Sequence, residues 1–214
     1  MIRILIADDH AIVREGLKRI VTSAEDMEVV GEAADGTEVM QHVHGSDFDV
    51  LVLDLSMPGR SGMELIKLVR GEKPKLRILV LSMHEELQYA VRAIKSGASG
   101  YLTKESAPVQ LIQVLRKIAA GGAFISTDVA EQLALGSMSG GAAAAHEKLT
   151  DREFEVFRLI AVGMSVTEIA ARLNLSAKTI STHKANLMQK MNLQNQSDLI
   201  RYAIKHGITD PLEP

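Results

Sequence analysis

The chain opens with Ile2-Arg3-Ile4-Leu5-Ile6-Ala7-Asp8-Asp9, a short apolar run that ends in two acidic residues. Four more strand-like runs follow, near 28–33, 50–54, 77–82 and 99–102. They are rich in β-branched residues and bounded by turn residues, as strands are. Segments of helical periodicity separate them, near 11–23, 36–44, 62–70, 85–96 and 106–120. This alternation predicts an α/β domain over residues 1–122, with a doubly wound, five-stranded parallel sheet.

Charged residues lie at the ends of three of these runs. Asp8 and Asp9 close the first run, Asp54 closes the third, and Lys104 follows the fifth. Parallel strands bring such ends to one edge, where open α/β sheets hold their sites. Carboxylates packed together raise one another's pKa, and a divalent cation with a lysine ammonium would relieve their repulsion. We therefore expect a Mg²⁺ site with one carboxylate free for covalent chemistry.

Composition narrows the class of protein. The 214 residues contain no cysteine, which excludes disulfides and thiolate metal sites and agrees with a reducing compartment. The first residues lack the basic region and cleavage site of a signal peptide. No apolar run approaches the roughly 18 residues that span a bilayer. We expect a cytoplasmic protein with no membrane partner.

A change in composition marks the end of the first domain. Residues 135–145 are small and nearly uncharged, which is typical of a linker. Ser126–Leu135 has the pattern of one more helix, and Ala142–Ala145 could extend a helix instead. The predicted organisation is a first domain at 1–122, a linker with a possible helix at 123–147, and a second domain at 148–214.

The second domain reads as all-helical. Thr150-Asp151-Arg152-Glu153 and Ser165-Val166-Thr167-Glu168 are capping boxes that open two helices. Ser176 can cap a third helix over Ala177–Met191, separated from the second by a very tight turn. This organisation is typical of a helix-turn-helix module.

A fourth helix closes the domain. Asn195 or Ser197 can cap it, and it would run through Lys205 and stop at Gly207. The four helices therefore occupy fewer than about seventy residues, a size that suits a small helical module.

Charge is distributed unevenly along the chain. The net charge is −3, yet residues 172–205 are locally basic. That segment suggests a surface for a phosphate backbone. A solvated helix face is the alternative that remains open at this point.

Together these motifs resemble those of NarL/FixJ-type response regulators, in which a receiver domain is joined to a LuxR-type helix-turn-helix domain. The N-terminal match rests on Ala7–His10, Val52–Gly59, Leu81–Met83 and Gly100–Lys104. The C-terminal match rests on Leu149–Glu153, Glu168–Ala170 and Leu175–His183. The resemblance implies a flavodoxin-like first domain. It also implies a DNA-binding transcription regulator rather than an enzyme, with at most weak autophosphatase activity.

The resemblance also implies a phosphorylation site. A sensor histidine kinase would transfer a phosphoryl group to Asp54. Asp9, and Asp8 through water, would hold Mg²⁺ together with Asp54 and the backbone carbonyl of Ser56. Lys104 would take another oxygen of the phosphoryl group, because positioning and electrostatics carry nearly all such catalysis.

Further roles come from the same resemblance. Ser82 and Tyr101 match the hydroxyl and the aromatic ring that switch conformation on phosphorylation. Ser56 and His84 lie at positions that adjust the lifetime of the phosphoaspartate. His10 is next to the acidic pair, but we interpret it as a helix-start residue without a ligand role.

DNA recognition is expected in the helix over 177–191, which would enter the major groove. Ile180, Leu187 and Met191 fall on another face and are expected in the core, and His183 could equally be a packed residue. The exposed stripe would comprise Lys178, Ser181, Thr182 and Ala185. The residues expected to reach phosphates and base edges are Lys178, Thr179, Ser181, Thr182, His183, Lys184 and Ala185.

Two further expectations concern how the protein reads DNA bases and how it forms a dimer. Ser181 and Ala185 are small where several relatives carry long residues, so base readout would rest on few contacts. Leu199, Ile200 and Ala203 form an apolar stripe that suits a symmetric dimer of the phosphorylated protein, or else packs into its own domain. Promoter DNA is the expected partner, and RNA polymerase is a further candidate.

Two other functions compete with this interpretation. One is a Mg²⁺ phosphohydrolase with an aspartyl nucleophile, but haloacid-dehalogenase-like enzymes separate their aspartates by one residue, whereas Asp8 and Asp9 are adjacent. The other is a DNA-binding protein whose receiver no longer takes phosphate, against which the intact Asp9, Asp54, Ser82 and Lys104 argue. In the resting state the receiver would cover the recognition helix or fail to dimerise, and the sequence does not decide between these.

Overall fold

The computed structural model describes residues 1–57, 62–83, 87–138, 144–173 and 175–208. The contacts divide the chain into two compact units, Met1–Gly140 and Gly141–Pro214. Each unit is described by itself.

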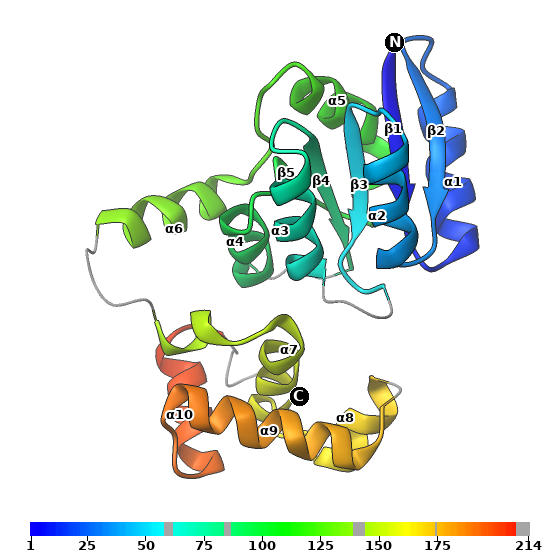
Figure 1. Cartoon of the computed structure of the whole chain (residues 1–214). Coiled ribbons are helices and arrows are strands. Elements are labelled where there is room, and N and C mark those ends of the chain that lie inside the picture. The colour runs from blue at the N-terminus through cyan, green and yellow to red at the C-terminus, as the bar shows by residue number, and fades with distance from the viewer. Residues whose placement is uncertain (58–61, 84–86, 139–143, 174, 209–214) are drawn as a thin grey trace. The chain divides into compact units, whose positions relative to one another are not determined.

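The first unit is built on a five-stranded parallel sheet, counted over the described residues (Figure 1). Its strands lie in the order β2-β1-β3-β4-β5, and the parallel pairing includes Ala7 beside Leu53. Because β1 and β3 are neighbours, the residues that follow them emerge side by side at one edge. The strands are β1 (Ile2–Ala7), β2 (Met27–Ala33), β3 (Val50–Asp54), β4 (Arg77–Ser82) and β5 (Gly100–Thr103).

Helices cover both faces of the sheet, which confirms the predicted doubly wound fold (Figure 1). The helices on one face are α1 (Ala11–Thr22) and α5 (Ala107–Ala119), which contact each other. Those on the other face are α2 (Gly36–Gly45), α3 (Gly62–Glu72) and α4 (Leu87–Lys95). Each of these elements lies within a few residues of its predicted range.

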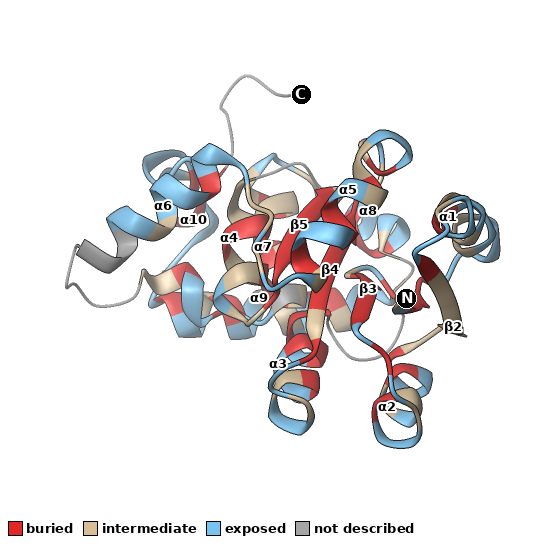
Figure 2. Cartoon of the chain, turned by 90° about the horizontal axis from the view of Figure 1, so that it is seen from above, coloured by how far each residue is buried: buried red, intermediate tan, exposed pale blue. Residues whose placement is uncertain are grey.

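The core explains why the central strands read as continuous apolar runs. The central strands are almost entirely buried (Figure 2), because parallel sheets are covered on both faces. On one face, Ile4, Ile6 and Val52 pack with Leu17 of α1 and Leu111 of α5 in a single cluster. Alternation of side chains turns the residues between them toward α2, α3 and α4. This packing holds the carboxyl edge of the sheet in place.

The chain leaves α5 and returns to the sheet. The Tyr101 amide donates to the Phe124 carbonyl at 3.0 Å, and the Phe124 amide donates to the Ser99 carbonyl at 3.1 Å. Helix α6 (Thr127–Met138) follows, contacts α4, and buries Val129. The predicted helix near 126–135 is therefore confirmed. The domain boundaries drawn from the sequence remain predictions, and 139–143, the centre of the expected linker, lie outside the described residues.

The described part of the second unit contains a short 3₁₀ helix and four α-helices. The predicted helix over 177–191 is confirmed to the residue. The elements are η1 (Ala145–Lys148), α7 (Asp151–Ala161), α8 (Val166–Arg172), α9 (Ala177–Met191) and α10 (Gln196–Lys205).

Side-chain caps begin all four of these helices. Thr150 and Ser165 form the predicted capping boxes with Glu153 and Glu168. The Ser176 hydroxyl accepts from the Thr179 amide at 3.0 Å. The Asn195 side chain accepts from the Asp198 amide at 2.9 Å, so Asn195 rather than Ser197 caps α10. Each cap satisfies backbone donors that a helix end would otherwise leave unpaired.

Candidate functional site

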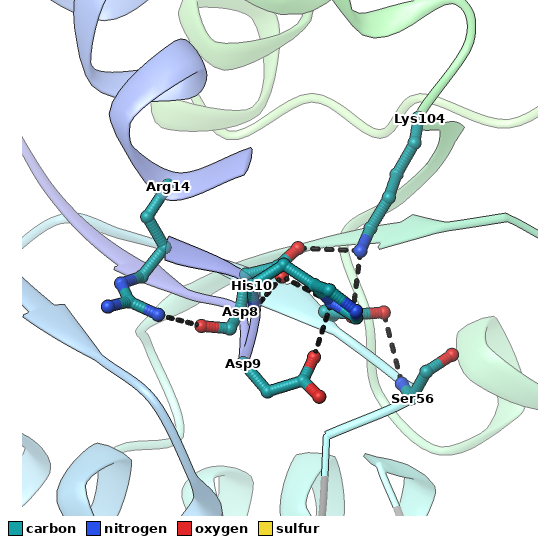
Figure 3. A network of polar contacts seen from close by, with 7 residues as sticks. Asp8, Asp9, His10, Arg14, Ser56 and Lys104 are labelled. Atoms are coloured by element: carbon teal, nitrogen blue, oxygen red, sulfur yellow. Dashed lines mark hydrogen bonds and ion pairs between the residues drawn. The ribbon is translucent and has the colours of Figure 1, made fainter. Parts of the chain in front are cut away.

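Two buried carboxylates share one ammonium at the carboxyl edge of the sheet. The Lys104 Nζ atom lies 2.6 Å from Asp8 Oδ2 and 2.8 Å from Asp54 Oδ2 (Figure 3). The side chains of Asp8 and Asp54 are each 1% exposed, and that of Lys104 is 12% exposed. The ends of β1 and β3 are adjacent in the sheet, and the Lys104 side chain reaches them from the end of β5, which lies beyond β4. The three strand ends therefore contribute to one cluster, as the sequence predicted.

Backbone amides hold the second oxygen of each carboxylate. The Ser56 amide donates to Asp54 Oδ1 at 3.0 Å, and the His10 amide donates to Asp8 Oδ1 at 2.8 Å. Both bonds join an aspartate to the residue two positions later, a local pattern that aspartate favours after a strand. They fix the orientation of the two carboxylates.

Burial and pairing oppose each other in the protonation of this cluster. Burial raises the pKa of Asp54 above its ordinary value, although hydrogen bonds from Lys104 and Ser56 act to lower it. The negative charge of Asp8 adds a smaller upward effect. Burial alone would lower the pKa of Lys104, but its hydrogen bonds to Asp54 and Asp8 hold that pKa above the ordinary value. The predicted repulsion between carboxylates is therefore present, but desolvation is the larger cause.

The same edge offers ligands for a cation. One potential ligand atom from each of Asp8, Asp9, His10 and Asp54 lies within 4.8 Å of the others. Three of the four are carboxylate oxygens, the hard ligands that Mg²⁺ prefers. The donor set therefore fits the predicted Mg²⁺ site.

Two residues that the sequence left without a role belong to this network (Figure 3). The His10 Nδ1 atom lies 2.9 Å from Asp9 Oδ1, while its backbone begins α1 as expected. Arg14 donates through Nη1 to the Asp8 carbonyl at 2.6 Å and through Nε to Glu32 at 3.3 Å. A basic residue one turn into the helix that follows an acidic strand end is the signal that could have identified Arg14.

The expected switch residues lie on the neighbouring strands. Ser82 ends β4 and is fully buried, and Tyr101 on β5 is 8% exposed. The Lys104 amide donates to the Ser82 carbonyl at 2.8 Å, so the backbone places Ser82 beside the lysine. Ser56 is exposed, whereas His84 lies outside the described residues.

Helix α9 presents two different faces. Ile180, Leu187 and Met191 are buried, as predicted. Lys184 is half-buried, and its Nζ atom donates to Gln196 Oε1 at 2.9 Å. His183 and Thr179 are also half-buried. The residues of the predicted stripe are all exposed, namely Lys178, Ser181, Thr182 and Ala185.

Helix α10 bears on the two alternatives for its apolar stripe. Leu199 and Ala203 are fully buried inside their own unit, which favours the alternative in which the stripe packs into its own domain. Within that unit, α10 contacts α7. Ile200 is half-buried, and Ile204 is 46% exposed.

A buried carboxylate–lysine cluster on a doubly wound sheet, followed by a helix-turn-helix unit, defines the class of regulators that couple a receiver domain to DNA binding. Residues 4–116 match the response regulator receiver domain family, and residues 147–203 match the luxR family of bacterial regulatory proteins. The chain belongs to the NarL/FixJ family of two-component response regulators. It is a DNA-binding phosphoacceptor regulator, which sets aside the phosphohydrolase alternative.

Known relatives match over nearly the whole chain. Response regulator UvrY of Escherichia coli O6:H1 is 32% identical over 209 residues, which cover 97% of this chain and 96% of the relative. Oxygen regulatory protein NreC of Staphylococcus epidermidis (strain ATCC 12228) is 38% identical over 216 residues, which cover 97% and 99%.

A solved structure agrees in fold and organisation. RcsB from Salmonella enterica serovar Typhimurium, bound to the promoter rprA in the presence of the phosphomimetic BeF₃⁻, matches with a TM-score of 0.60 and 34% identity. The match covers 94% of this chain and 97% of that one. Among the described residues of the present chain, no helix is long and apolar enough to cross a membrane.

Proposed function

We propose that Asp54 accepts a phosphoryl group from a sensor histidine kinase, with Mg²⁺ as the required cation. The observation that carries this proposal is the pairing of Lys104 with both Asp8 and Asp54, at 2.6 and 2.8 Å. Asp8, Asp9, Asp54 and the backbone carbonyl of Ser56 would hold Mg²⁺, which when bound neutralises charge on the transferred group.

The transfer itself exchanges one phosphorus bond for another. The phosphorus–nitrogen bond of the kinase phosphohistidine breaks, and its electron pair leaves with the imidazole. A carboxylate oxygen of Asp54 bonds to phosphorus, which makes an acyl phosphate. Lys104 then holds an oxygen of the phosphoryl group instead of bridging two carboxylates. Electrostatic stabilisation and positioning of this kind carry most phosphoryl transfer.

The buried hydroxyl of Ser82 and the ring of Tyr101 read the phosphoryl group. Ser82 lies beside the backbone of Lys104, so inward rotation of its hydroxyl would reach the acyl phosphate. Ser56 and His84 set the lifetime of the phosphoaspartate. If exchange of both residues for other polar side chains leaves that lifetime unchanged, these two assignments are wrong.

Helix α9 reads promoter DNA, and phosphorylation favours a dimer that binds paired half-sites. Support comes from the exposed stripe on α9, and from solved structures of RcsB dimers bound to DNA. The expected contacts are Lys178, Thr179, Ser181, Thr182, His183, Lys184 and Ala185. Because promoter DNA is the partner, the cytoplasm is the proposed location.

The phosphoacceptor is tested by intact mass after incubation with Mg²⁺ and acetyl phosphate. Wild type should gain one phosphoryl group, and Asp54→Asn should gain none. Asp47→Asn is the matched control, because Asp47 is 93% exposed and lies outside the cluster. No adduct on wild type, under conditions that modify a known receiver, would favour a regulator that works without phosphate.

DNA binding is tested by the affinity for promoter fragments with and without BeF₃⁻ and Mg²⁺. Tighter binding of wild type, with no gain for Asp54→Asn, is the expected result. Equal affinity in both states would contradict the proposed switch.

A further inference from the structure

We propose that His10 is an additional protein ligand of the cation site, and that it gives the site a preference for imidazole-binding transition metals such as Co²⁺ and Ni²⁺. This inference rests on the metal site of the proposed function. It goes beyond that site because the proposed Mg²⁺ site uses oxygen ligands only and gives the His10 side chain no role in binding.

The position of the imidazole carries the argument (Figure 3). The His10 Nδ1 atom lies 2.9 Å from Asp9 Oδ1 and 3.4 Å from Asp8 Oδ1. Ligand atoms about 2.1 Å from an octahedral ion, at right angles to each other, are separated by about 3.0 Å. Nδ1 therefore already lies at the spacing of adjacent ligands of one ion, while Asp54 completes a set within 4.8 Å.

Two hydrogen bonds hold His10 and Asp8 in this arrangement. The His10 amide donates to Asp8 Oδ1 at 2.8 Å, which ties the histidine to the carboxylate beside it. Arg14 donates to the Asp8 carbonyl at 2.6 Å and fixes the start of α1. The His10 side chain is 66% exposed, so a hydrated ion can reach it without movement of the core.

The chemistry of the imidazole nitrogen then determines which ions bind more tightly when His10 is present. Imidazole nitrogen suits later transition metals such as Ni²⁺ and Zn²⁺, whereas carboxylate, carbonyl and water oxygens suit Mg²⁺ and Mn²⁺. Affinity at a mixed nitrogen–oxygen site rises from Mn²⁺ through Co²⁺ to Ni²⁺. His10 should therefore add little affinity for Mg²⁺ and progressively more for the later ions.

The test compares metal affinities of the full-length chain. His10→Gln keeps the backbone amide and a polar side chain but removes the imidazole. His44→Gln is the matched control. His44 lies on α2 beside Glu72, and its side chain is 60% exposed, close to the 66% of His10. Calorimetry with Ni²⁺, Mn²⁺ and Mg²⁺ and the visible absorption of bound Co²⁺ are measured for both variants, for Asp54→Asn and for wild type.

The expected result is selective. His10→Gln should weaken Ni²⁺ binding by about tenfold or more, since even outer-shell partners of metal ligands change affinity by about 10–100-fold. Mg²⁺ affinity should change less than about twofold, since Mg²⁺ gains little from nitrogen. The Co²⁺ spectrum should lose its nitrogen-dependent shift in His10→Gln and keep it in His44→Gln.

The contrary outcomes separate the inference from the proposed function. Equal Ni²⁺ affinity and an unchanged Co²⁺ spectrum in His10→Gln would overturn the role of His10, while Mg²⁺-dependent labelling of Asp54 could still stand. If Asp54→Asn binds every ion as wild type does, the ions bind elsewhere, and the proposed metal site itself is wrong.

Discussion

Replacement of Lys104 by methionine would leave two buried carboxylates without their shared cation. Asp8 and Asp54 are each 1% exposed, so their charges are poorly solvated and depend on the ammonium. Removing one partner of a buried ion pair typically costs about 3–5 kcal/mol. We therefore expect the metal-free receiver domain to lose a large part of its stability near pH 7.

Protonation limits that loss. The variant can avoid two adjacent charges if Asp54, whose pKa is already raised by burial, takes up a proton. From an ordinary pKa near 3.9, protonation costs about 4.2 kcal/mol at pH 7 and about 1.5 kcal/mol at pH 5. The expected loss is therefore about 3–4 kcal/mol at pH 7 and about 1–1.5 kcal/mol at pH 5.

The sign of the pH dependence follows from the direction of the Asp54 shift. A carboxyl group whose pKa is raised on folding contributes its full stability below its unfolded pKa and loses it as the pH rises through its folded pKa. Loss of Lys104 raises the Asp54 pKa further, so the variant and wild type should converge as the pH falls.

Amide hydrogen exchange in EDTA, followed by mass spectrometry on peptides from β1 and β3, measures the free energy of opening in the full chain. Lys18→Met is the control: Lys18 pairs with Glu32 at 2.8 Å at an exposed site, so its loss should change exchange much less. A loss in Lys104→Met that is the same at pH 5 and pH 7, or no loss at pH 7, would refute the argument.

Three further predictions concern other parts of the chain. Arg14→Gln should speed amide hydrogen exchange at the start of α1, because it removes charge-assisted hydrogen bonds worth about 1.5–3 kcal/mol. Arg19→Gln removes a solvent-exposed ion pair and should not speed this exchange. Equal effects of the two substitutions would contradict a stabilising role for Arg14. Thr150→Ala should destabilise the second unit by about 1 kcal/mol in thermal unfolding, and recovery by Thr150→Ser would identify the cap as the cause. Lys178→Gln should reduce the slope of log affinity against log salt by about 0.9 if Lys178 contacts a DNA phosphate, and an unchanged slope would exclude that contact.

The sequence predicted the sheet and its acidic edge well because both follow from short-range patterns. Strand ends in a parallel sheet must meet at one edge, so the grouping of Asp8, Asp54 and Lys104 could be inferred before any distance was known. The caps at Thr150, Ser165 and Ser176 were equally predictable, since each depends on residues only three positions apart.

Side-chain direction and helix partners were less predictable. Periodicity placed Leu199 and Ala203 on one face of a helix, but it does not say whether the neighbour that covers this face belongs to the same chain. His10 was recognised as a helix start, yet its contact with Asp9 depends on the rotamer of an exposed ring. The position of Arg14, one turn into the helix after the acidic strand end, is visible in the sequence, but its bond to the Asp8 backbone carbonyl is not.

The cap of α9 has an electrostatic consequence. Ser176 is neutral, and the first turn of α9 carries no acidic residue, whereas α2 begins with Asp35 and carries Glu38 in its first turn. The partial positive charge at the start of α9 is therefore not offset by an acidic cap or first-turn residue, and it would attract an incoming anion. An acidic cap such as Ser176→Asp would favour the isolated helix while repelling a phosphate at the same point. If α9 contacts DNA as proposed, the stability of the helix would favour an acidic side chain at position 176, whereas binding of a phosphate would favour a neutral one.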